Sequence, residues 1–524
     1  MAADGHDDHR HDQRITRRQA LVASAGACAG GAAMLGLLGG EGPSWAVAEQ
    51  LKRYGRSAVD PSAQNAILIV TDSTRADYVG AYGSKRGLTP NLDALARDGV
   101  TFTRAHPESM PTGPARNALL TGDREFPYRH WHPEPFLPKN PGWSSIPPGK
   151  PTLLDLLDRN GVTTAYVTDN PFLIGPRYAR IRRRTDHFVG FEGQTAIYSA
   201  RHRDPVPVAQ VQRFLPPSLR GGSGAENALA LYLAYAPRGV PEDEYFTARV
   251  FKAAIDLIET LRAHQPFVLI VDGFDPHEPW DPPPAWARRF AGENPLDYEP
   301  LHPFNAPISA MSQLGLSPAV AKRVQGLYAA ELAFTDHWIG NLLGKVESAG
   351  LTDSTAVVYT SDHGILLGEH GLIGKSGRHI HREVHHTPLI VRHPERKLAG
   401  RRNRYFASTN DVAPTLLGFL GIRPGRQMDG EDLTAVFDRA RKGEIAPRKH
   451  MTASYDDYVM CHDGRWLLFM RTDGFDKNLF DTKTDRGETR NLAAARPDVV
   501  RRLTAALKRE AGGPLPRFTR TGVR

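Results

Sequence analysis

Cysteine is almost absent from this sequence, which holds only Cys28 and Cys461 among its 524 residues. Two cysteines exclude a disulfide framework and any zinc site built from thiolates. Long, strongly apolar runs are also missing, and the mean hydropathy is −0.42. With 40% hydrophobic and 24% charged residues, the composition excludes an integral membrane protein and a disordered chain.

The length and the charge set the next limits. A chain of 57.7 kDa exceeds one compact core, so we expect two domains or one large domain. The net charge of +8 and the pI near 9.4 fit anionic partners. No nucleic-acid-binding motif accompanies this charge, so we expect a solvated basic surface and no nucleic-acid partner. An anionic small substrate stays open.

Residues 1–48 carry the features of a twin-arginine export signal. Arg17 and Arg18 precede a weakly apolar, Gly/Ala-rich stretch, and small residues up to Ala48 form a cleavage pattern. A membrane anchor would need about 20 strongly apolar residues, and the residues before Cys28 make a poor lipid-attachment motif. We therefore predict passage through the twin-arginine machinery, secretion, and no stable membrane insertion after cleavage.

Apolar runs of strand length alternate with helical patterns after this signal. Strands are predicted at 65–71, 100–103, 162–168, 267–271 and 355–360, and long helices at 243–264 and 318–348. Continuous apolar runs are typical of parallel strands buried on both faces. We predict an α/β fold in which a mostly parallel sheet flanked by helices spans residues 49–445.

Residues 446–524 have a different sequence pattern, with short apolar runs, and this pattern predicts a smaller C-terminal α+β subdomain with short antiparallel strands. The Pro-rich segments 123–150 and 276–307 are predicted to be surface loops that border a pocket. The histidine-rich stretch 379–386 has two interpretations, pocket lining or solvated turns, and the second is the one we expect.

Acidic and histidine residues follow three of the predicted strands. Asp72 follows the first, Asp275 and His277 follow a later one, and Asp362 and His363 follow the last. Carboxyl ends of parallel strands meet at one edge of a sheet, where ligands bind. Oxygen ligands favour Ca, Mg or Mn, and a histidine adds Mn or Zn. We expect one divalent metal ion here, although turn-capping carboxylates are the alternative.

A second constellation lies around Thr112. Pro114 suits the first turn of a helix, which would present Thr112 at an N-terminus that favours anions. Arg116, one turn later, is able to bind the same anion with two N–H groups. A hydroxyl beside a divalent cation is a candidate nucleophile. Taken alone, Thr112 would be an ordinary helix cap.

Over residues 65–494 the chain resembles the sulfatase family of the alkaline phosphatase superfamily. The matching segments are Ile69 to Asp72 with Arg75 and Asp77, Thr89 to Asp93, Pro114 with Arg116, Leu120 to Gly122, Asp275 to His277, Ser361 to Gly364, Gly368 to Lys375, Leu479 to Asp481 and Glu488 to Leu492. The resemblance implies an alkaline-phosphatase-like fold and a sulfuric or phosphoric ester hydrolase.

The resemblance also implies roles for single residues. Asp72, Asp362 and His363 would hold the metal, joined by Thr112 as the nucleophile. The substrate's anionic group would be bound by Arg116, His277 and Lys375, which also take part in catalysis, with His370 close by.

Three departures from the family pattern bear on the reaction. The family places Cys or Ser where this chain has Thr112, and oxidation of threonine would give a ketone, so no formylglycine is expected. A phosphothreonine is hydrolysed by in-line attack of water on phosphorus. A threonine sulfate cannot be expelled by hemiacetal collapse and would need water to attack sulfur directly. Ser73 replaces a second Asp, and residues 168–171 replace a segment that carries a Lys and a His.

Three functions follow from these observations. The leading one is a secreted, metal-dependent hydrolase of sulfate or phosphate esters with Thr112 as a metal-bound nucleophile. The second is a phospho-group transferase or phosphodiesterase of the cell envelope. The third is a non-catalytic carbohydrate-binding relative, against which the retention of the charged site residues argues.

Overall fold

The computed structural model describes residues 62–135, 137–193, 206–221, 224–236, 238–301, 309–311, 316–438, 445–519 and 522–523. The predicted signal, 1–48, lies outside these residues. Within them, no helix is both long and apolar enough to span a bilayer. The description below concerns the compact unit from Tyr54 to Arg524.

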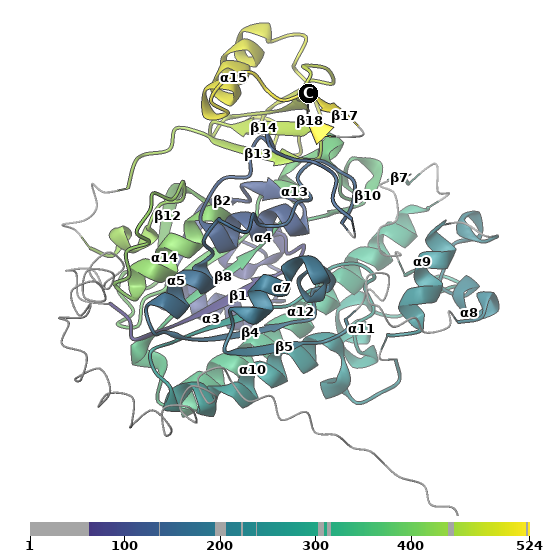
Figure 1. The fold of residues 1–524 in the computed structure, drawn as a ribbon. Helices are drawn as coiled ribbons and strands as arrows, with labels where there is room; N and C mark the ends of the chain where they lie inside the picture. Colours follow the sequence, from purple (N-terminus) through teal and green to yellow (C-terminus); the bar gives the residue numbers. More distant parts are fainter. Residues whose placement is uncertain are drawn as a thin grey trace, which may run out of the picture. The chain divides into compact units, whose positions relative to one another are not determined.

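A mixed, mostly parallel sheet forms the centre of this unit (Figure 1). Its order is β12-β2-β11-β8-β1-β6-β4-β5. The strands are β1 Asn65–Thr71, β2 Val100–His106, β4 Thr163–Thr168, β5 His187–Gly190, β6 Phe267–Asp272, β8 Thr355–Ser361, β11 Leu389–Arg392 and β12 Arg401–Ser408. Only β11 runs antiparallel to its neighbours β2 and β8. The predicted α/β fold is therefore confirmed.

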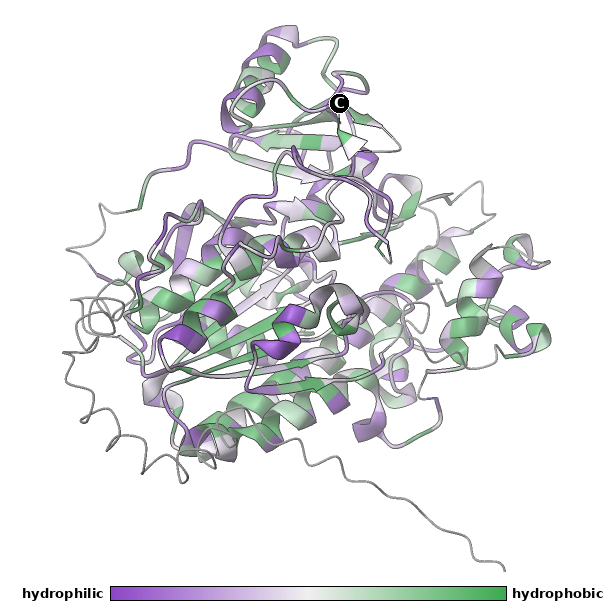
Figure 2. Cartoon of the chain, in the orientation of Figure 1, coloured by the Kyte–Doolittle hydropathy of each residue, from purple (hydrophilic) through white to green (hydrophobic). Residues whose placement is uncertain are grey.

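Helices cover both faces because the strands alternate apolar side chains between two cores. In β1, Leu68 and Val70 join one core, whereas Ile67 and Ile69 join the other. Helices α4 (Thr112–Thr121), α5 (Leu153–Arg159) and α14 (Val412–Phe419) pack in the first core. Helices α3 (Pro90–Asp98), α10 (Phe246–Ala263) and α12 (Pro318–Ser348) pack in the second. Figure 2 shows the central strands in the green of hydrophobic residues.

The C-terminal part forms a second sheet in the order β16-β15-β14-β13-β3. Its strands are β3 Ser109–Met110, β13 Met451–Tyr455, β14 Tyr458–His462, β15 Trp466–Arg471 and β16 Asn478–Asp481. Helix α15 (Pro497–Glu510) shares a core with β14, β15 and β16, and the buried Cys461 belongs to that core. The predicted antiparallel strands are present. The parallel strand β3 comes from the segment just before Thr112.

Besides several short 3-10 helices, the described chain contains further short α-helices and strands. They are α6 Pro171–Ile174, α7 Ala179–Arg183, α8 Val208–Gln212, α9 Gly224–Leu233, α11 Pro284–Ala291, α13 Arg382–His385, β7 Ser309–Ala310, β9 Leu366–Leu367, β10 Leu372–Gly374, β17 Phe518–Thr519 and β18 Gly522–Val523.

Three local predictions need correction. The strand predicted to end at residue 103 continues to His106, where it pairs with Ser408 of β12. The predicted loop 276–307 contains α11, which begins at Pro284 because proline suits the first turn of a helix. The long helix predicted from residue 243 begins at Phe246, after a one-turn helix and the extended Tyr245.

The stretch 379–386 is not a set of solvated turns. His385 is only 3% exposed and lies on α13, whose Val384 carbonyl accepts a hydrogen bond from Gly364 N–H. A Cβ at Gly364 would lie 2.0 Å from the Glu383 carbonyl oxygen, so glycine is what lets α13 pack this closely. The described part of 123–150 forms no helix or strand, yet Trp143 in it is buried.

Candidate active site

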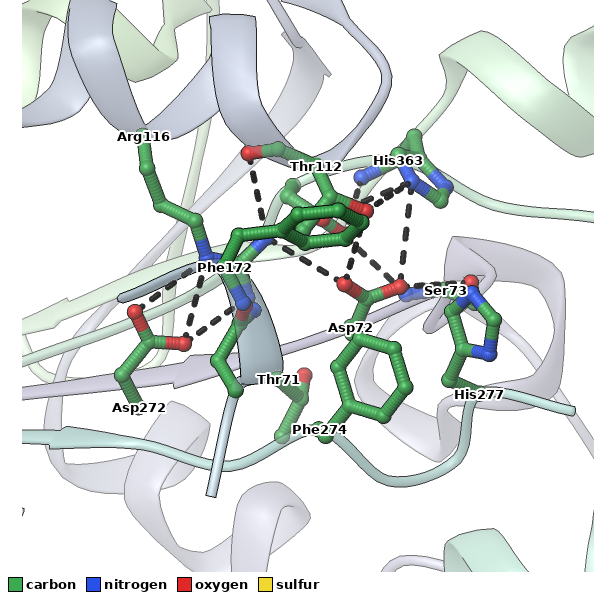
Figure 3. A network of polar contacts seen from close by, with 12 residues as sticks. Thr71, Asp72, Ser73, Thr112, Arg116, Phe172, Asp272, Phe274, His277 and His363 are labelled. Atoms are coloured by element: carbon green, nitrogen blue, oxygen red, sulfur yellow. Dashed lines mark hydrogen bonds and ion pairs between the residues drawn. The ribbon is translucent and has the colours of Figure 1, made fainter. Parts of the chain in front are cut away.

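Two adjacent parallel strands deliver the predicted metal ligands to one place (Figure 3). Asp72 follows β1, while Asp362 and His363 follow β8, and the last residues of these strands, Thr71 and Ser361, are register partners. One ligand atom of each of Asp72, Asp362 and His363 lies within 4.8 Å of the others, and all three residues are buried. The sequence-based grouping of these three residues is thus observed.

The protonation state of His363 leaves one ring nitrogen free to bind a cation. Its Nδ1 lies 3.0 Å from the Gly364 carbonyl oxygen, which only accepts, so Nδ1 carries the proton. Nε2 then presents a lone pair 3.4 Å from Asp362 Oδ2 and 3.7 Å from Asp72 Oδ1. Burial lowers the pKa of His363 to about 4, so the ring is neutral at pH 7. A lone pair facing two carboxylates suits a divalent cation between them, with nitrogen favouring Mn or Zn.

Arg116 is the cation that the structure places among these carboxylates. Its guanidinium bonds Asp272 at 2.8 Å, Asp72 at 3.2 Å and also Asp362. All four side chains are at most 1% exposed. Three buried carboxylates against one guanidinium leave negative charge that a divalent cation would balance. The predicted contact of Arg116 with a substrate anion stays a prediction.

Ser73 orients Asp72 and Asp362. Its N–H donates to Asp362 Oδ1 at 3.0 Å, and its hydroxyl donates to Asp72 Oδ1 at 2.8 Å. The residue has a φ of +63°, in the left-handed region that short polar side chains tolerate. The Tyr328 hydroxyl donates to the Ser73 carbonyl at 2.9 Å and so supports the turn. The serine that replaces a family carboxylate therefore positions the remaining ones.

Thr112 opens α4, as predicted, and lies beside this group. Its Oγ1 donates to Asp72 Oδ2 at 3.1 Å and lies 3.5 Å from His363 Nε2. The next residue, Gly113, lies under the indole of Trp143, so close that a Cβ would be 2.8 Å from the ring. The predicted loop 123–150 thus packs against the start of α4 and covers the residue next to Thr112.

Lys375, His277 and Glu278 form a second polar group. Lys375 Nζ lies 3.0 Å from His277 Nε2 and 3.0 Å from Glu278 Oε2. His277 Nδ1 donates to the Glu278 carbonyl at 2.6 Å, so Nε2 accepts from the ammonium. Burial lowers the pKa of His277 to about 4, with Lys375 acting in the same direction. In this arrangement His277 Nε2 carries no proton and accepts one of the hydrogen bonds of Lys375 Nζ.

The sequence reasoning assigned no role to Glu278, which bonds Lys375, or to the buried Asp169. Asp169, within the segment that departs from the family, accepts from Phe274 N–H at 2.8 Å. Burial raises the pKa of Asp169 to about 8, helped by the Asp275 charge. The sequence feature that could have identified Glu278 is its position directly after His277. Adjacency in sequence does not show, however, that its carboxylate contacts Lys375.

His370 has contacts of a different kind. Its ring stacks on His381 with centroids 3.7 Å apart, and its Nε2 lies 3.6 Å from Glu383. Burial lowers the pKa of His370, but the hydrogen bond and charge of Glu383 together with the charges of Glu488 and Glu369 outweigh it, so the net direction is upward. These contacts give His370 a supporting position, and its predicted role toward the substrate stays a prediction.

The comparison with protein families decides the identity of the fold. A model described as "Sulfatase" matches residues 64–422. The chain belongs to the sulfatase family. A second model, "N-sulphoglucosamine sulphohydrolase, C-terminal", matches residues 368–511 of this sulfatase-family protein.

Individual relatives are distant but extensive. An N-acetylglucosamine-6-O-sulfatase of Bacteroides thetaiotaomicron is 23% identical and covers 82% of each chain. A multifunctional alkaline phosphatase superfamily protein of Trinickia caryophylli is 24% identical over 82% of this chain and 91% of its own. Human iduronate 2-sulfatase is 26% identical over 78% and 74%.

Solved structures agree on the fold. The phosphonate monoester hydrolase of Agrobacterium radiobacter has a TM-score of 0.63 and 21% identity, covering 88% of this chain and 99% of its own. A structure described as BT4656 with D-glucosamine-2-N,6-O-disulfate has a TM-score of 0.61 and 20% identity, covering 86% and 98%. The protein is a sulfatase-family ester hydrolase.

Proposed function

We propose that this hydrolase is metal-dependent, uses Thr112 as its nucleophile, and cleaves phosphoryl esters that carry a single negative charge, namely phosphodiesters or phosphonate monoesters. The observation that carries the proposal is the hydrogen bond from Thr112 Oγ1 to Asp72 Oδ2, at 3.1 Å, inside the group that would hold the metal. No oxidised aldehyde is needed when the intermediate is a phosphothreonine.

The substrate's charge is inferred from the second polar group. The Lys375 ammonium is paired with the Glu278 carboxylate at 3.0 Å, and residues 168–171, which replace a family segment with a Lys and a His, are Thr, Asp, Asn and Pro. Because the Glu278 carboxylate offsets part of the positive charge of Lys375, the site suits a monoanion better than the dianion of a phosphate monoester. The threonine chemistry then favours phosphorus over sulfur within the monoanions.

In the mechanism, Asp72, Asp362 and His363 would hold a divalent cation, which when bound neutralises developing charge and acidifies a neighbouring hydroxyl. Thr112 Oγ1 gives up its proton along the hydrogen bond to Asp72 and forms a bond to phosphorus, while the bond from phosphorus to the leaving oxygen breaks. Lys375 Nζ supplies a proton to that oxygen. Water then attacks phosphorus and gives one proton to the neutral Lys375 amine, while the bond from phosphorus to Oγ1 breaks and Asp72 returns its proton to Oγ1, which restores the threonine.

The test is hydrolysis of three nitrophenyl esters, a sulfate, a phosphate monoester and a phosphate diester, by the purified chain before and after chelation. We expect turnover of the diester to exceed that of the other two, to vanish on chelation, and to return with Mn or Zn. Faster turnover of the sulfate ester would contradict the choice of phosphorus. Turnover that survives exhaustive chelation would contradict metal dependence.

Export is a separate part of the proposal and is supported by the Arg17-Arg18 pair and the small residues before Ala48. We expect the protein recovered outside the cytoplasm to begin at residue 49. N-terminal sequencing of that material checks this, and replacement of Arg17 and Arg18 by lysine should retain the protein inside the cell.

A further inference from the structure

A second polar cavity contains none of the residues assigned to the chemistry. It has a volume of about 270 Å³, and its walls come from β2, α13, β14 and the segment after β16. Three arginines, Arg104, Arg382 and Arg486, line it. Four histidines line it as well, and they come from three of these elements.

Among the described residues, no ion pair or side-chain hydrogen bond involves the guanidinium groups of these arginines. Arg382 has only longer-range electrostatic interactions, with the carboxyl groups of Asp77 and Glu488. Arg104 is held by the ring of Phe406, 5.0 Å from the guanidinium carbon. The carboxylates of Asp77 and Asp463, which lie near the histidines, are taken by Arg75 at 2.8 Å and Arg502 at 2.7 Å.

Glu488 is the carboxyl among the lining residues. Its Oε2 lies 2.9 Å from His381 Nδ1 and accepts a hydrogen bond from Arg382 N–H at 3.1 Å. Burial raises the pKa of Glu488 to about 8, and the Glu383 charge adds to this, so the group is mostly neutral at pH 7. The three arginines therefore outnumber the single carboxyl group of the lining.

Hydrogen bonds between two of the histidines determine which ring nitrogen of each carries the proton. His106 Nδ1 lies 3.1 Å from the His385 carbonyl oxygen and 3.0 Å from His385 Nδ1. Since the carbonyl only accepts, His106 Nδ1 carries the proton, and its Nε2 keeps a lone pair. His385 Nδ1 then accepts, so its Nε2 carries an N–H. Both Nε2 atoms are buried without a hydrogen-bond partner.

His462 provides another free lone pair. Its Nε2 lies 3.4 Å from Thr482 Oγ1, whose own proton goes to the Arg465 carbonyl at 2.9 Å. His462 Nε2 is therefore the donor, and the buried Nδ1 is an acceptor without a partner. Burial lowers the pKa of His462 to about 4, which keeps the ring neutral at pH 7.

We propose that this cavity binds a phosphate group that retains a proton. The three guanidinium groups and His385 Nε2–H donate to its unprotonated oxygens, and its O–H donates to the free lone pair of His106 or His462. Sulfate has the same shape and no proton at neutral pH. Sulfate would leave those histidine lone pairs facing its oxygens without a hydrogen bond. Buried polar groups left unpaired cost binding free energy, so the site should bind phosphate more tightly than sulfate.

The experiment is titration calorimetry of the full chain with inorganic phosphate and with sulfate at pH 7. The background is Lys375→Gln, which weakens binding of either anion at the proposed catalytic centre. We expect phosphate to bind at least about tenfold more tightly than sulfate. Adding Arg104→Gln and Arg486→Gln should weaken phosphate binding by at least about tenfold.

Arg490→Gln is the matched control, because it removes the same charge from the same segment outside the lining. Arg486 is exposed, so Arg486→Gln alone serves if the double variant does not fold. Glycerol phosphate in place of phosphate distinguishes a phosphomonoester ligand, which would bind more tightly, from the free ion. Equal affinity for sulfate, or no difference between the arginine variants and the control, would overturn the proposal.

Discussion

Lys375 and Glu278 form a buried ion pair in which Nζ lies 3.0 Å from Oε2 and 3.1 Å from Oε1. The two side chains are 10% and 5% exposed. The lysine implied to bind the substrate's anion therefore shares its charge with a carboxylate of the same chain. A substrate has to compete with, or complement, that pair.

Replacing Glu278 with glutamine should release this charge. We expect Glu278→Gln to raise kcat/KM for a dianionic phosphate monoester about tenfold relative to a monoanionic diester, because a full positive charge then faces the substrate. The measurement is the ratio of the two kcat/KM values. The exposed Glu293→Gln controls for loss of a carboxylate, and an unchanged ratio in Glu278→Gln would remove the pair from substrate selection.

Substitutions of Thr112 should distinguish a chemical role of its hydroxyl from a role in packing. Thr112→Ala is expected to lower kcat by at least about 10³-fold with little change in Tm, whereas Thr112→Ser keeps the hydroxyl and a measurable rate. Acid-quenched enzyme should carry a phosphoryl group on residue 112, seen by mass spectrometry of the peptide. Full activity in the alanine variant would exclude Thr112 as the nucleophile.

Metal removal should affect stability as well as rate. Asp72, Asp272 and Asp362 share one guanidinium, so a bound cation stabilises the folded state by mass action. We expect chelation to lower Tm by several degrees and to abolish activity, both restored by Mn or Zn. Asp362→Asn should make Tm nearly insensitive to chelator. A wild-type Tm that ignores chelation would refute the site.

Gly113 should not tolerate a side chain. Gly113→Ala improves helix propensity, but its Cβ would lie 2.8 Å from the Trp143 ring, and such overpacking typically costs about 1–3 kcal/mol. We expect a lower Tm and reduced activity, because the indole or the start of α4 has to move. Gly149→Ala is the control, since nothing lies within 4 Å of its added carbon.

Glu488 should shape the pH dependence of stability. Its pKa in the folded state is raised from 4.5 to about 8 by burial and by Glu383, so the stabilising protonated form is fully present below pH 4.5 and is lost as the pH rises through 8. We expect the Tm of Glu488→Gln, relative to wild type, to increase between pH 5 and pH 9. A difference that is constant with pH would mean that the group stays charged.

Local signals in the sequence were enough for much of the fold. The apolar run of β1 and the 318–348 helix were predicted because each is a property of one continuous segment. The grouping of Asp72 with Asp362 followed from the rule that parallel strands end at the same edge.

Pairings set by tertiary packing were out of reach. Lys375 and Glu278 are 97 positions apart, and their contact depends on how two loops fold back. His106 and His385 are 279 positions apart, and the burial of His385 depends on α13 packing beside Gly364. The stretch 379–386 was expected to form solvated turns, because the sequence alone does not show that one polar ring is buried against another.

The pairing of β3 with β13 has a consequence for the order in which the protein is made. Ser109 and Met110, just ahead of Thr112, take their strand partners from Ser454 and Tyr455. During synthesis this pairing forms only after more than 300 later residues have emerged. The segment that leads into Thr112 therefore gains its strand partner late, when most of the polypeptide exists.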